Sequence, residues 1–221
     1  MQTIQEIREG FGRPDVKLVA VSKTKPAEAI LNIYNQGQRI FGENRAMELE
    51  EKAQKLPKDI AWHMIGHLQR NKVKNIIPYV AMIHSIDSIR LAAEVNKQAR
   101  RVDRVVPCLL QIRIAKEETK YGFDLQELLE WLSTGQWKEM DHIEIAGVMG
   151  MASFVPDMGI VREEFRYLKQ CFDELKSGIF ADYAPFREIS MGMSGDYHVA
   201  IEEGSTMVRI GTLIFGERNV Y

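Results

Sequence analysis

Two segments at opposite ends of the chain carry residue types that could do chemistry together. Lys23 closes an apolar run that starts at Lys17, and Gly211-Thr212 closes a second apolar run that starts at Met207. A lysine amine at the water-facing end of a buried strand can condense with an aldehyde to form an imine. Backbone N–H groups and a hydroxyl at the end of a second strand can bind a phosphate. The pair of segments therefore indicates a cofactor site.

The last apolar run adds a positive charge to this site. Side chains alternate along a strand, so Met207, Arg209 and Gly211 share one face. If the other face meets the helices, Arg209 points into the interior, where it needs an acceptor such as the ring nitrogen of pyridoxal phosphate. The same alternation brings Lys23 to the interior mouth, where desolvation and the charge of Lys25 or Arg209 would lower its pKa from about 10.4. For Arg209 alone, a structural ion pair is the alternative.

Two further polar residues follow strand-like runs, and each has a simpler alternative. Ser194 stands in a glycine-rich segment and can donate its hydroxyl to a phosphate, or it can only cap the helix that follows. Asn44 can hydrogen-bond a cofactor or Lys23, or it can cap the next helix. Gly211 can approach a phosphate or merely make a turn. Together these residues indicate a cofactor site more strongly than any one of them does alone.

Histidines four residues apart invite a rival metal site. That spacing ligates metal on a helix, but Gly66 and the apolar neighbours of His63 and His67 predict that a strand ends here. We therefore expect no metal site. Cys108 and Cys171 lie in no cysteine motif, which favours buried reduced thiols over a disulfide or a catalytic nucleophile.

The elements that must position these residues alternate along the whole chain. Strands are predicted at 18–22, 39–41, 61–65, 82–86, 105–112, 145–149, 188–191 and 207–210. Helices are predicted between them at 26–36, 45–55, 70–77, 88–100, 124–133, 161–176 and 197–203.

About eight βα units predict an α/β fold, a closed (β/α)8 TIM barrel, with residues 1–221 forming a single domain. A doubly wound sheet is the structural alternative, although the Gly-x-Gly-x-x-Gly fingerprint of its dinucleotide-binding version is absent. In such barrels the site lies at the carboxyl ends of the strands, and the turns after strands seven and eight often hold a phosphate.

Composition limits the kinds of partner. The net charge is −2, from 29 Lys plus Arg against 31 Asp plus Glu, which gives no broad attraction for nucleic acid or an anionic membrane. The longest apolar runs fall short of a bilayer span, and residues 1–6 lack the basic and apolar regions of a signal peptide. The sequence therefore predicts a cytoplasmic protein.

These motifs, in this order, resemble those of the pyridoxal phosphate homeostasis proteins, also called the YggS/PROSC group. The resemblance covers nearly the whole chain and rests on segments 19–26, 41–44, 62–72, 147–149, 191–194 and 204–212. It implies the barrel of the alanine racemase N-terminal domain and pyridoxal 5'-phosphate as the cofactor. Residues 1–13 are short beside the leading helix common in that family, which leaves the packing of a first helix open.

Carried over by position, the resemblance implies a role for seven residues. Lys23 would form the internal aldimine, and Arg209 would face the pyridine nitrogen. The others would hold the phosphate or line the pocket: Ser194, Gly211 and Thr212 for the phosphate, and Asn44 and Met149 for the pocket, with Met149 near the ring.

The resemblance also implies a carrier that regulates intracellular pyridoxal phosphate, without an accepted reaction, and that could supply recipient apo-enzymes. Racemases of this fold take a second acid or base from an additional C-terminal domain of a partner subunit, whereas this sequence ends at Tyr221 directly after the last strand. An arginine at the ring nitrogen also makes the ring a weaker electron sink. We therefore expect a monomeric binding protein without efficient racemisation.

Three alternatives stay open at this point. The chain could be a small pyridoxal phosphate-dependent amino-acid racemase or lyase. It could be a sugar-phosphate isomerase that uses Ser194 and Gly211 but forms no imine. Lys25 could hold a second pyridoxal phosphate.

Overall fold

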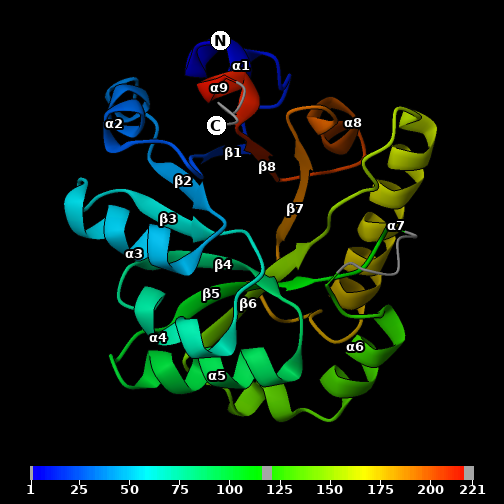
Figure 1. The fold of residues 1–221 in the computed structure, drawn as a ribbon. Coiled ribbons are helices and arrows are strands. Elements are labelled where there is room, and N and C mark those ends of the chain that lie inside the picture. Colours follow the sequence, from blue (N-terminus) through cyan, green and yellow to red (C-terminus); the bar gives the residue numbers. More distant parts are fainter. Residues whose placement is uncertain (1, 116–120, 217–221) are drawn as a thin grey trace.

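Eight parallel strands close into a barrel in the computed structural model, which describes residues 2–115 and 121–216 (Figure 1). The strands follow one another round the barrel in chain order, and β8 pairs with β1. Their bounds are β1 (Lys17–Val21), β2 (Ile40–Glu43), β3 (Ala61–Met64), β4 (Val80–Ile86), β5 (Val106–Gln111), β6 (Ile143–Met149), β7 (Glu188–Met193) and β8 (Met207–Ile210). The predicted TIM barrel is thus confirmed, and the open doubly wound sheet is excluded.

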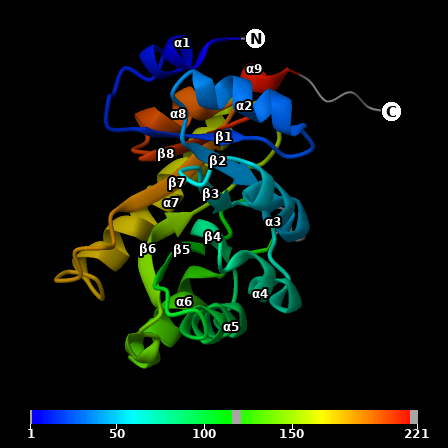
Figure 2. The same cartoon turned by 90° about the vertical axis from the view of Figure 1, so that its left-hand side faces the viewer.

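Helices connect the strands and cover the outside of the barrel (Figure 2). They are α1 (Ile4–Glu9), α2 (Ala27–Asn35), α3 (Ala46–Lys55), η1 (Arg70–Lys72), α4 (Val73–Ile76), α5 (Ile89–Arg100), α6 (Leu125–Ser133), η2 (Gln136–Glu139), α7 (Met158–Ser177), α8 (Tyr197–Glu202) and α9 (Thr212–Phe215).

One predicted helix starts earlier than expected, and two α-helices were not predicted from the sequence pattern. Helix α7 starts before the predicted residue 161, because the Asp157 side chain accepts a hydrogen bond from Gly159 N and caps an earlier turn. Helix α1 was not predicted; it begins with a capping box between Thr3 and Glu6 and buries two isoleucines. Helix α9 was not predicted either, and Gln2 N donates to Leu213 O in it at 3.0 Å. The two ends of the described chain therefore lie together beside β1 and β8 (Figure 1).

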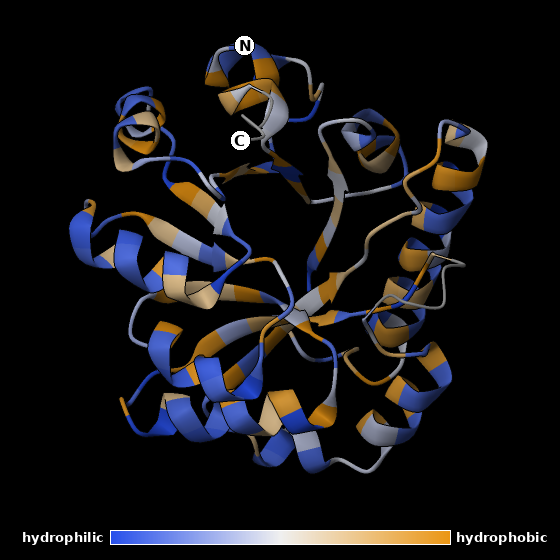
Figure 3. Cartoon of the chain, viewed as in Figure 1, coloured by the Kyte–Doolittle hydropathy of each residue, from blue (hydrophilic) through white to orange (hydrophobic). Residues whose placement is uncertain are grey.

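The barrel wall separates two apolar regions. On β1, Leu18 and Ala20 belong to the large core between the strands and the helices, whereas Val19 and Val21 pack in a separate cluster with Met207 of β8. In Figure 3 the helices round the barrel carry both hydrophobic and hydrophilic residues, as expected of helices that pack one side on the strands. The predicted alternation along β1 and β8 is therefore confirmed, and it is this alternation that directs Arg209 inward.

One glycine sets the register of the sixth strand. Gly147 has a φ of +151°, and a Cβ on it would lie 1.9 Å from the Glu188 carbonyl oxygen of β7. Beside it, the register between β5 and β6 shifts between Cys108 and Leu109. The glycine therefore allows a close approach of two backbones, and beyond it Met149 faces the inner cluster with Leu109.

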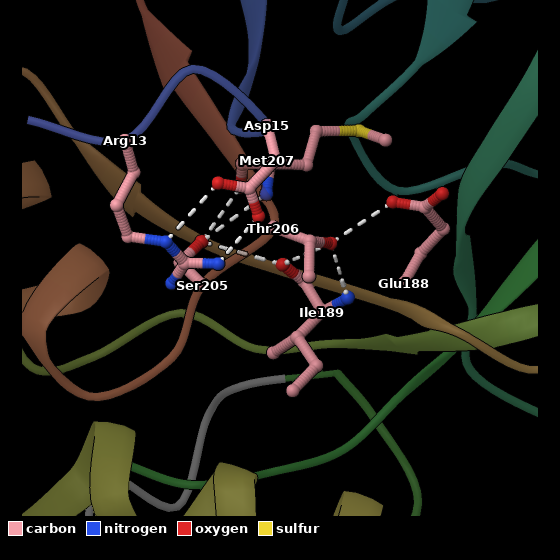
Figure 4. Close-up of polar contacts among 7 residues, drawn as sticks. All are labelled: Arg13, Asp15, Glu188, Ile189, Ser205, Thr206 and Met207. Carbon is pink, nitrogen blue, oxygen red and sulfur yellow. Dashed lines mark hydrogen bonds and ion pairs between the residues drawn. The ribbon is translucent and has the colours of Figure 1, made fainter. Parts of the chain in front are cut away.

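A polar cluster closes the other end of the barrel, where the strands begin (Figure 4). Glu188 is buried, pairs with Lys17, and accepts a hydrogen bond from Thr206 Oγ1 at 2.9 Å. The Thr206 hydroxyl oxygen also accepts from Ile189 N at 2.8 Å. These contacts fix the turn that leads into β8, and they lie at the end of the barrel away from the carboxyl ends of the strands.

Both cysteines are buried and free, as predicted. Burial raises the pKa of the Cys171 thiol to about 11 and also raises that of Cys108, so neither is a thiolate at neutral pH. In the described parts of the chain, no helix combines the length and the apolar character of a membrane span.

Candidate functional site

A cavity of about 620 Å³ opens at the carboxyl end of the barrel. It lies between the turns that follow β1, β7 and β8 and the segment that follows β6. Six of the seven predicted site residues line it: Lys23, Asn44, Ser194, Arg209, Gly211 and Thr212. The structure thus brings together residues from the two ends of the chain. The seventh, Met149, is fully buried in the inner cluster and is not among the lining residues.

Lys23 stands in the turn directly after β1. Ser22 N donates to Gly42 O of β2 at 3.0 Å, and Lys25 N donates back to Ser22 O at 3.0 Å, which closes the turn. Lys23 is half-buried between them and faces the cavity. Lys25 also lines the cavity, but its amine donates to Phe215 O in α9 at 3.1 Å. The two lysines therefore differ in their surroundings.

Arg209 is buried and reaches the floor of the cavity from β8. Its Nη1 donates to Ser190 Oγ at 2.6 Å, and its Nη2 donates to Gly150 O at 3.0 Å. Among the described residues no carboxylate lies within ion-pair distance of it, so the ion-pair alternative is wrong there. Burial lowers its pKa to about 10, opposed by Asp196, and the guanidinium stays charged at neutral pH. N–H donors beyond these two remain for an acceptor in the cavity.

The hydrogen bonds of Arg209 continue into the barrel. Ser190 Oγ lies 2.9 Å from His84 Nδ1, and His84 Nε2 lies 2.9 Å from His63 Nδ1. Because a guanidinium only donates, Ser190 accepts from Arg209 and can donate its own hydroxyl proton to His84. This assigns His84 as the Nε2–H tautomer, which donates to His63. A directed chain of four side chains thus leads from the cavity to the barrel interior.

Both histidines of this chain are neutral. Burial lowers the pKa of His63 to about 3, with a smaller contribution from Lys17. Burial, His63 and Arg209 lower the pKa of His84 well below 6.5. The chain therefore holds the guanidinium without adding a second positive charge beside it.

His63 and His67 do not lie together as the ligands of one metal ion would. His63 faces the interior, whereas His67 lies after β3, 2.9 Å from Asp87 Oδ2 and stacked on Tyr121 at 3.8 Å between ring centroids. Strand β3 ends at Met64, one residue before the predicted end and before Gly66. Within residues 2–115 and 121–216 no group of three or more His, Cys, Asp or Glu is arranged to hold a metal ion.

The turns after β7 and β8 form the side of the cavity where the sequence predicts phosphate binding. Gly211 N donates to Ser194 Oγ at 3.2 Å, which joins the two turns. The capping alternative for Ser194 is wrong, because the cap of α8 is Asp196, whereas Gly211 does form the turn between β8 and α9. Thr212 is exposed at the cavity edge as the first residue of that helix. Ser194, Gly211 and Thr212 thus lie together where the sequence predicts a phosphate.

Asn44 carries an unpaired buried atom in the cavity wall. Its Oδ1 is buried without a hydrogen-bond partner among the described residues. The helix-capping alternative is wrong, because the cap of α3 is Arg45, whose side chain makes no capping hydrogen bond. A buried polar atom without a partner is costly, so this oxygen fits a ligand that donates a hydrogen bond.

Several lining residues were missed by sequence reasoning. Met151, Phe154 and Met158 form an apolar wall after β6, and Phe154 is 98% exposed. Ser153 is fixed there, since its N and Oγ donate to the two Glu164 carboxylate oxygens at 2.6 and 2.7 Å. These residues follow a strand in a long connecting segment, and in a barrel that position is a sequence signal for residues that line the site.

Asp196 and Ser190 were also missed. Asp196 lines the cavity, and burial raises its pKa although it accepts a hydrogen bond from Met193 N. Ser190 shares the inward parity of Glu188 on β7, which is a sequence signal, but only the fold pairs it with Arg209.

The fold and the cavity at its carboxyl end define a barrel of the alanine racemase N-terminal type. The family model described as "Alanine racemase, N-terminal domain" matches residues 2–219. Alanine racemase of Clostridium difficile 630 superposes with a TM-score of 0.77 at 15% identity, covering 97% of this chain and 59% of that one, which is a likeness of fold.

More similar relatives narrow the class. The pyridoxal phosphate homeostasis protein of Aquifex aeolicus is 40% identical over 225 residues, covering 99% of this chain and 95% of the relative. The protein of the same name from Homo sapiens is 40% identical over 215 residues, covering 92% and 77%. PipY of Synechococcus elongatus, solved with pyridoxal phosphate bound, has a TM-score of 0.84 at 33% identity and covers 96% of this chain and 98% of that one. The chain therefore belongs to the pyridoxal phosphate homeostasis protein family.

Proposed function

We propose that this protein binds pyridoxal 5'-phosphate as an aldimine of Lys23 and regulates intracellular pyridoxal phosphate without catalytic turnover. The observation that carries the proposal is the meeting of Lys23, Arg209 and the Ser194–Gly211 pair in one cavity. These groups match an aldehyde, a ring nitrogen and a phosphate, which are the three features of this cofactor. The cofactor, when bound, supplies an aldehyde that can be held and released reversibly.

The residues present fit the group on two independent observations. Asn44 Oδ1 is buried without a partner among the described residues, and Arg209 keeps N–H donors that its two hydrogen bonds do not use. Ser194 Oγ accepts from Gly211 N, so the two turns are held together at the cavity. Arg209 is oriented by Ser190, and Ser194 with Gly211 and Thr212 would hold the phosphate.

The lining residues support binding rather than turnover. Racemisation needs a second acid or base opposite the lysine. Among the described lining residues the ionisable side chains are Lys23, Lys25, Asp196 and Arg209. Lys25 donates to a carbonyl of α9, Asp196 accepts from its own turn, and Arg209 stays charged. None of these three is set up as the partner base. Transfer to apo-enzymes, a monomeric state and a cytoplasmic location stay predictions.

The test is reduction of the cofactor-loaded protein with borohydride, followed by mass spectrometry of its peptides. The wild-type protein is expected to carry a pyridoxyl group on Lys23. Lys23→Ala should lose the adduct and the imine absorbance, and bind the cofactor at least about tenfold more weakly, which is about 1.4 kcal/mol. Lys25→Ala is the matched control and should keep the Lys23 adduct. An unmodified Lys23 in the wild-type protein would favour an isomerase-like site without an imine.

A second measurement separates a carrier from an enzyme. Purified protein loaded with cofactor is incubated with D- and L-amino acids, and racemisation or elimination is compared with that by free pyridoxal phosphate. We expect no excess over the free cofactor. Turnover well above it that disappears in Lys23→Ala would establish the racemase or lyase alternative.

A further inference from the structure

Beneath the turn that carries Lys23 lies a cluster of three charged side chains, of which Lys52 and Glu43 are buried and Glu48 is partly buried. Lys52 of α3 is 9% exposed, and its Nζ donates to Ser22 O at 2.8 Å, to Glu43 Oε1 at 2.7 Å and to Glu48 Oε1 at 2.7 Å. These three bonds use all three of its N–H donors. The cluster is not part of the cavity lining. The cluster therefore acts on the cavity through the turn above it, to which it is hydrogen-bonded.

The cluster holds both neighbours of Lys23. Ser22 is fully buried; its carbonyl accepts from Lys52, and its hydroxyl donates to Glu43 Oε1 at 2.6 Å. On the other side, Thr24 N donates to Glu48 Oε1 at 2.6 Å. Lys23 thus stands between two residues whose backbones are each held by one member of the cluster, Ser22 by Lys52 and Thr24 by Glu48.

The anchored backbone is strained. Thr24 has a φ of +64°, in the left-handed region that a β-branched residue rarely adopts. Such a conformation persists only where the surroundings over-determine it, and it is concentrated at functional sites. The hydrogen bond from Thr24 N to Glu48 supplies that constraint here.

The charges of the cluster are poorly suited to a purely stabilising role. Glu43 is fully buried, and its Oε2 has no hydrogen-bond partner among the described residues. Burial raises the pKa of Glu43, opposed by the charge and hydrogen bond of Lys52. Buried ion pairs contribute little net stability compared with apolar packing, and their best-attested use is to fix one arrangement. The arrangement fixed in this protein is the turn around Lys23.

We propose that Lys52, Glu43 and Glu48 form a positioning clamp that holds the turn of Ser22 to Thr24 and thereby sets the direction in which the Lys23 amine enters the cavity. This inference rests on the proposed function, in which Lys23 bonds the cofactor. None of the three touches the cavity, so they are positioning residues rather than catalytic ones.

The size of the effect follows from the population of the clamped turn. Without the clamp, Thr24 relaxes out of the left-handed region, and only a fraction of molecules present Lys23 productively. Apparent affinity falls by that fraction, so a turn that is productive about one tenth of the time binds about tenfold more weakly. The rate of imine formation falls by the same factor, whereas the rate of global unfolding need not.

The test measures the affinity for pyridoxal 5'-phosphate and the rate of imine absorbance in the full-length protein. Glu48→Ala and Lys52→Met are expected to lower both about tenfold. Glu48→Gln keeps an oxygen acceptor for Thr24 N and should stay near wild type. The matched control is Lys55→Met on the same helix, because the Lys55–Glu51 pair is exposed and away from the turn.

A second substitution distinguishes positioning from general damage. Glycine adopts positive φ without a steric cost, so Thr24→Gly should restore most of the affinity lost in Glu48→Ala. Apo-protein unfolding in urea is followed in parallel, and Thr24→Gly is not expected to restore a loss that comes from global instability.

The outcomes separate this inference from the proposed function. A wild-type protein without a borohydride-trapped adduct on Lys23 overturns both. An intact Lys23 adduct with wild-type affinity and rate in Glu48→Ala and Lys52→Met overturns the clamp alone. So does a tenfold loss that Thr24→Gly leaves unrescued. Loss in both clamp variants, rescue by Thr24→Gly and an unchanged Lys55→Met establish it.

Discussion

Ser190→Ala tests the hydrogen-bonded chain that fixes Arg209. The substitution removes one oxygen from the buried end of β7 and leaves no group in its place. Arg209 Nη1 loses an acceptor at 2.6 Å and keeps only its Nη2 bond to Gly150 O. His84 Nδ1 loses its partner at 2.9 Å. His84 is fully buried, so its Nδ1 is left without a partner, whereas Arg209 still borders the cavity.

The expected cost follows from the two bonds. A hydrogen bond to a charged group contributes about 1.5–3 kcal/mol and a neutral one about 0.5–1.5 kcal/mol, so Ser190→Ala should lower the free energy of unfolding by about 2–4 kcal/mol. Arg209 should also lose its fixed direction, which weakens cofactor binding. Ser205→Ala is the matched control, because Ser205 is equally buried but has only neutral partners: its hydroxyl donates to Met191 O at 2.8 Å and accepts from Met207 N at 3.3 Å. Two neutral bonds should cost about 1–3 kcal/mol, less than the loss at Ser190.

The assay is urea unfolding of the cofactor-free wild type and the two variants at pH 7. If their m-values are equal, the shift in the unfolding midpoint reports the change in the free energy of unfolding. Cofactor affinity is measured on the same preparations. If Ser190→Ala costs no more than Ser205→Ala, the reasoning that a charged donor makes this serine special is refuted. If it costs the expected amount but leaves cofactor affinity unchanged, Arg209 does not depend on the chain for its orientation toward the ligand.

Two further predictions concern pH and backbone packing. His63 and His84 have folded-state pKa values below the 6.5 of the unfolded chain, so the unfolded state binds more protons as pH falls. The contribution of each histidine to the free energy of unfolding should be fully present above about pH 6.5 and should fall toward pH 4 by roughly 1 kcal/mol per pH unit. In urea unfolding, His63→Gln should show a smaller dependence on pH than the wild type, and an equal dependence would contradict this. Gly147→Ala should cost more than about 3 kcal/mol or prevent folding, because its Cβ meets Glu188 O at 1.9 Å. Thermal unfolding of Gly195→Ala, where a Cβ meets nothing within 4 Å, is the comparison, and similar melting of the two variants would be inconsistent with that packing.

The barrel could be predicted because its signals are local. Apolar runs of strand length, helical patterns between them and capping residues fix the elements within a few positions, as at β3 and β8. The errors lie where local chemistry is subtle, as at the Asp157 cap of α7 and the short helices α1 and α9. Short helices carry little periodicity, so sequence patterns detect them poorly.

The site was predictable in part for the same reason. Strand parity placed Lys23 and Arg209 on the inner side, and the carboxyl ends of parallel strands meet at one edge. Met149, expected in the pocket only from the family resemblance, shows the limit: it is buried in the inner cluster, and the depth of a side chain in a barrel depends on the stagger of the strands and on the register shift beside Gly147.

The sequence by itself determined the number and order of the strands, the inward face of β1 and β8, and the place of a lysine amine and of Gly211-Thr212 at strand ends, because each depends on residues close together in the chain. The tertiary structure alone decided which distant groups meet. Arg209 finds Ser190, 19 residues away, and Gly150, 59 residues away, while Lys52 reaches back 30 residues to Ser22. Such contacts depend on the register between strands and on the packing of helices against them, and no local pattern encodes either.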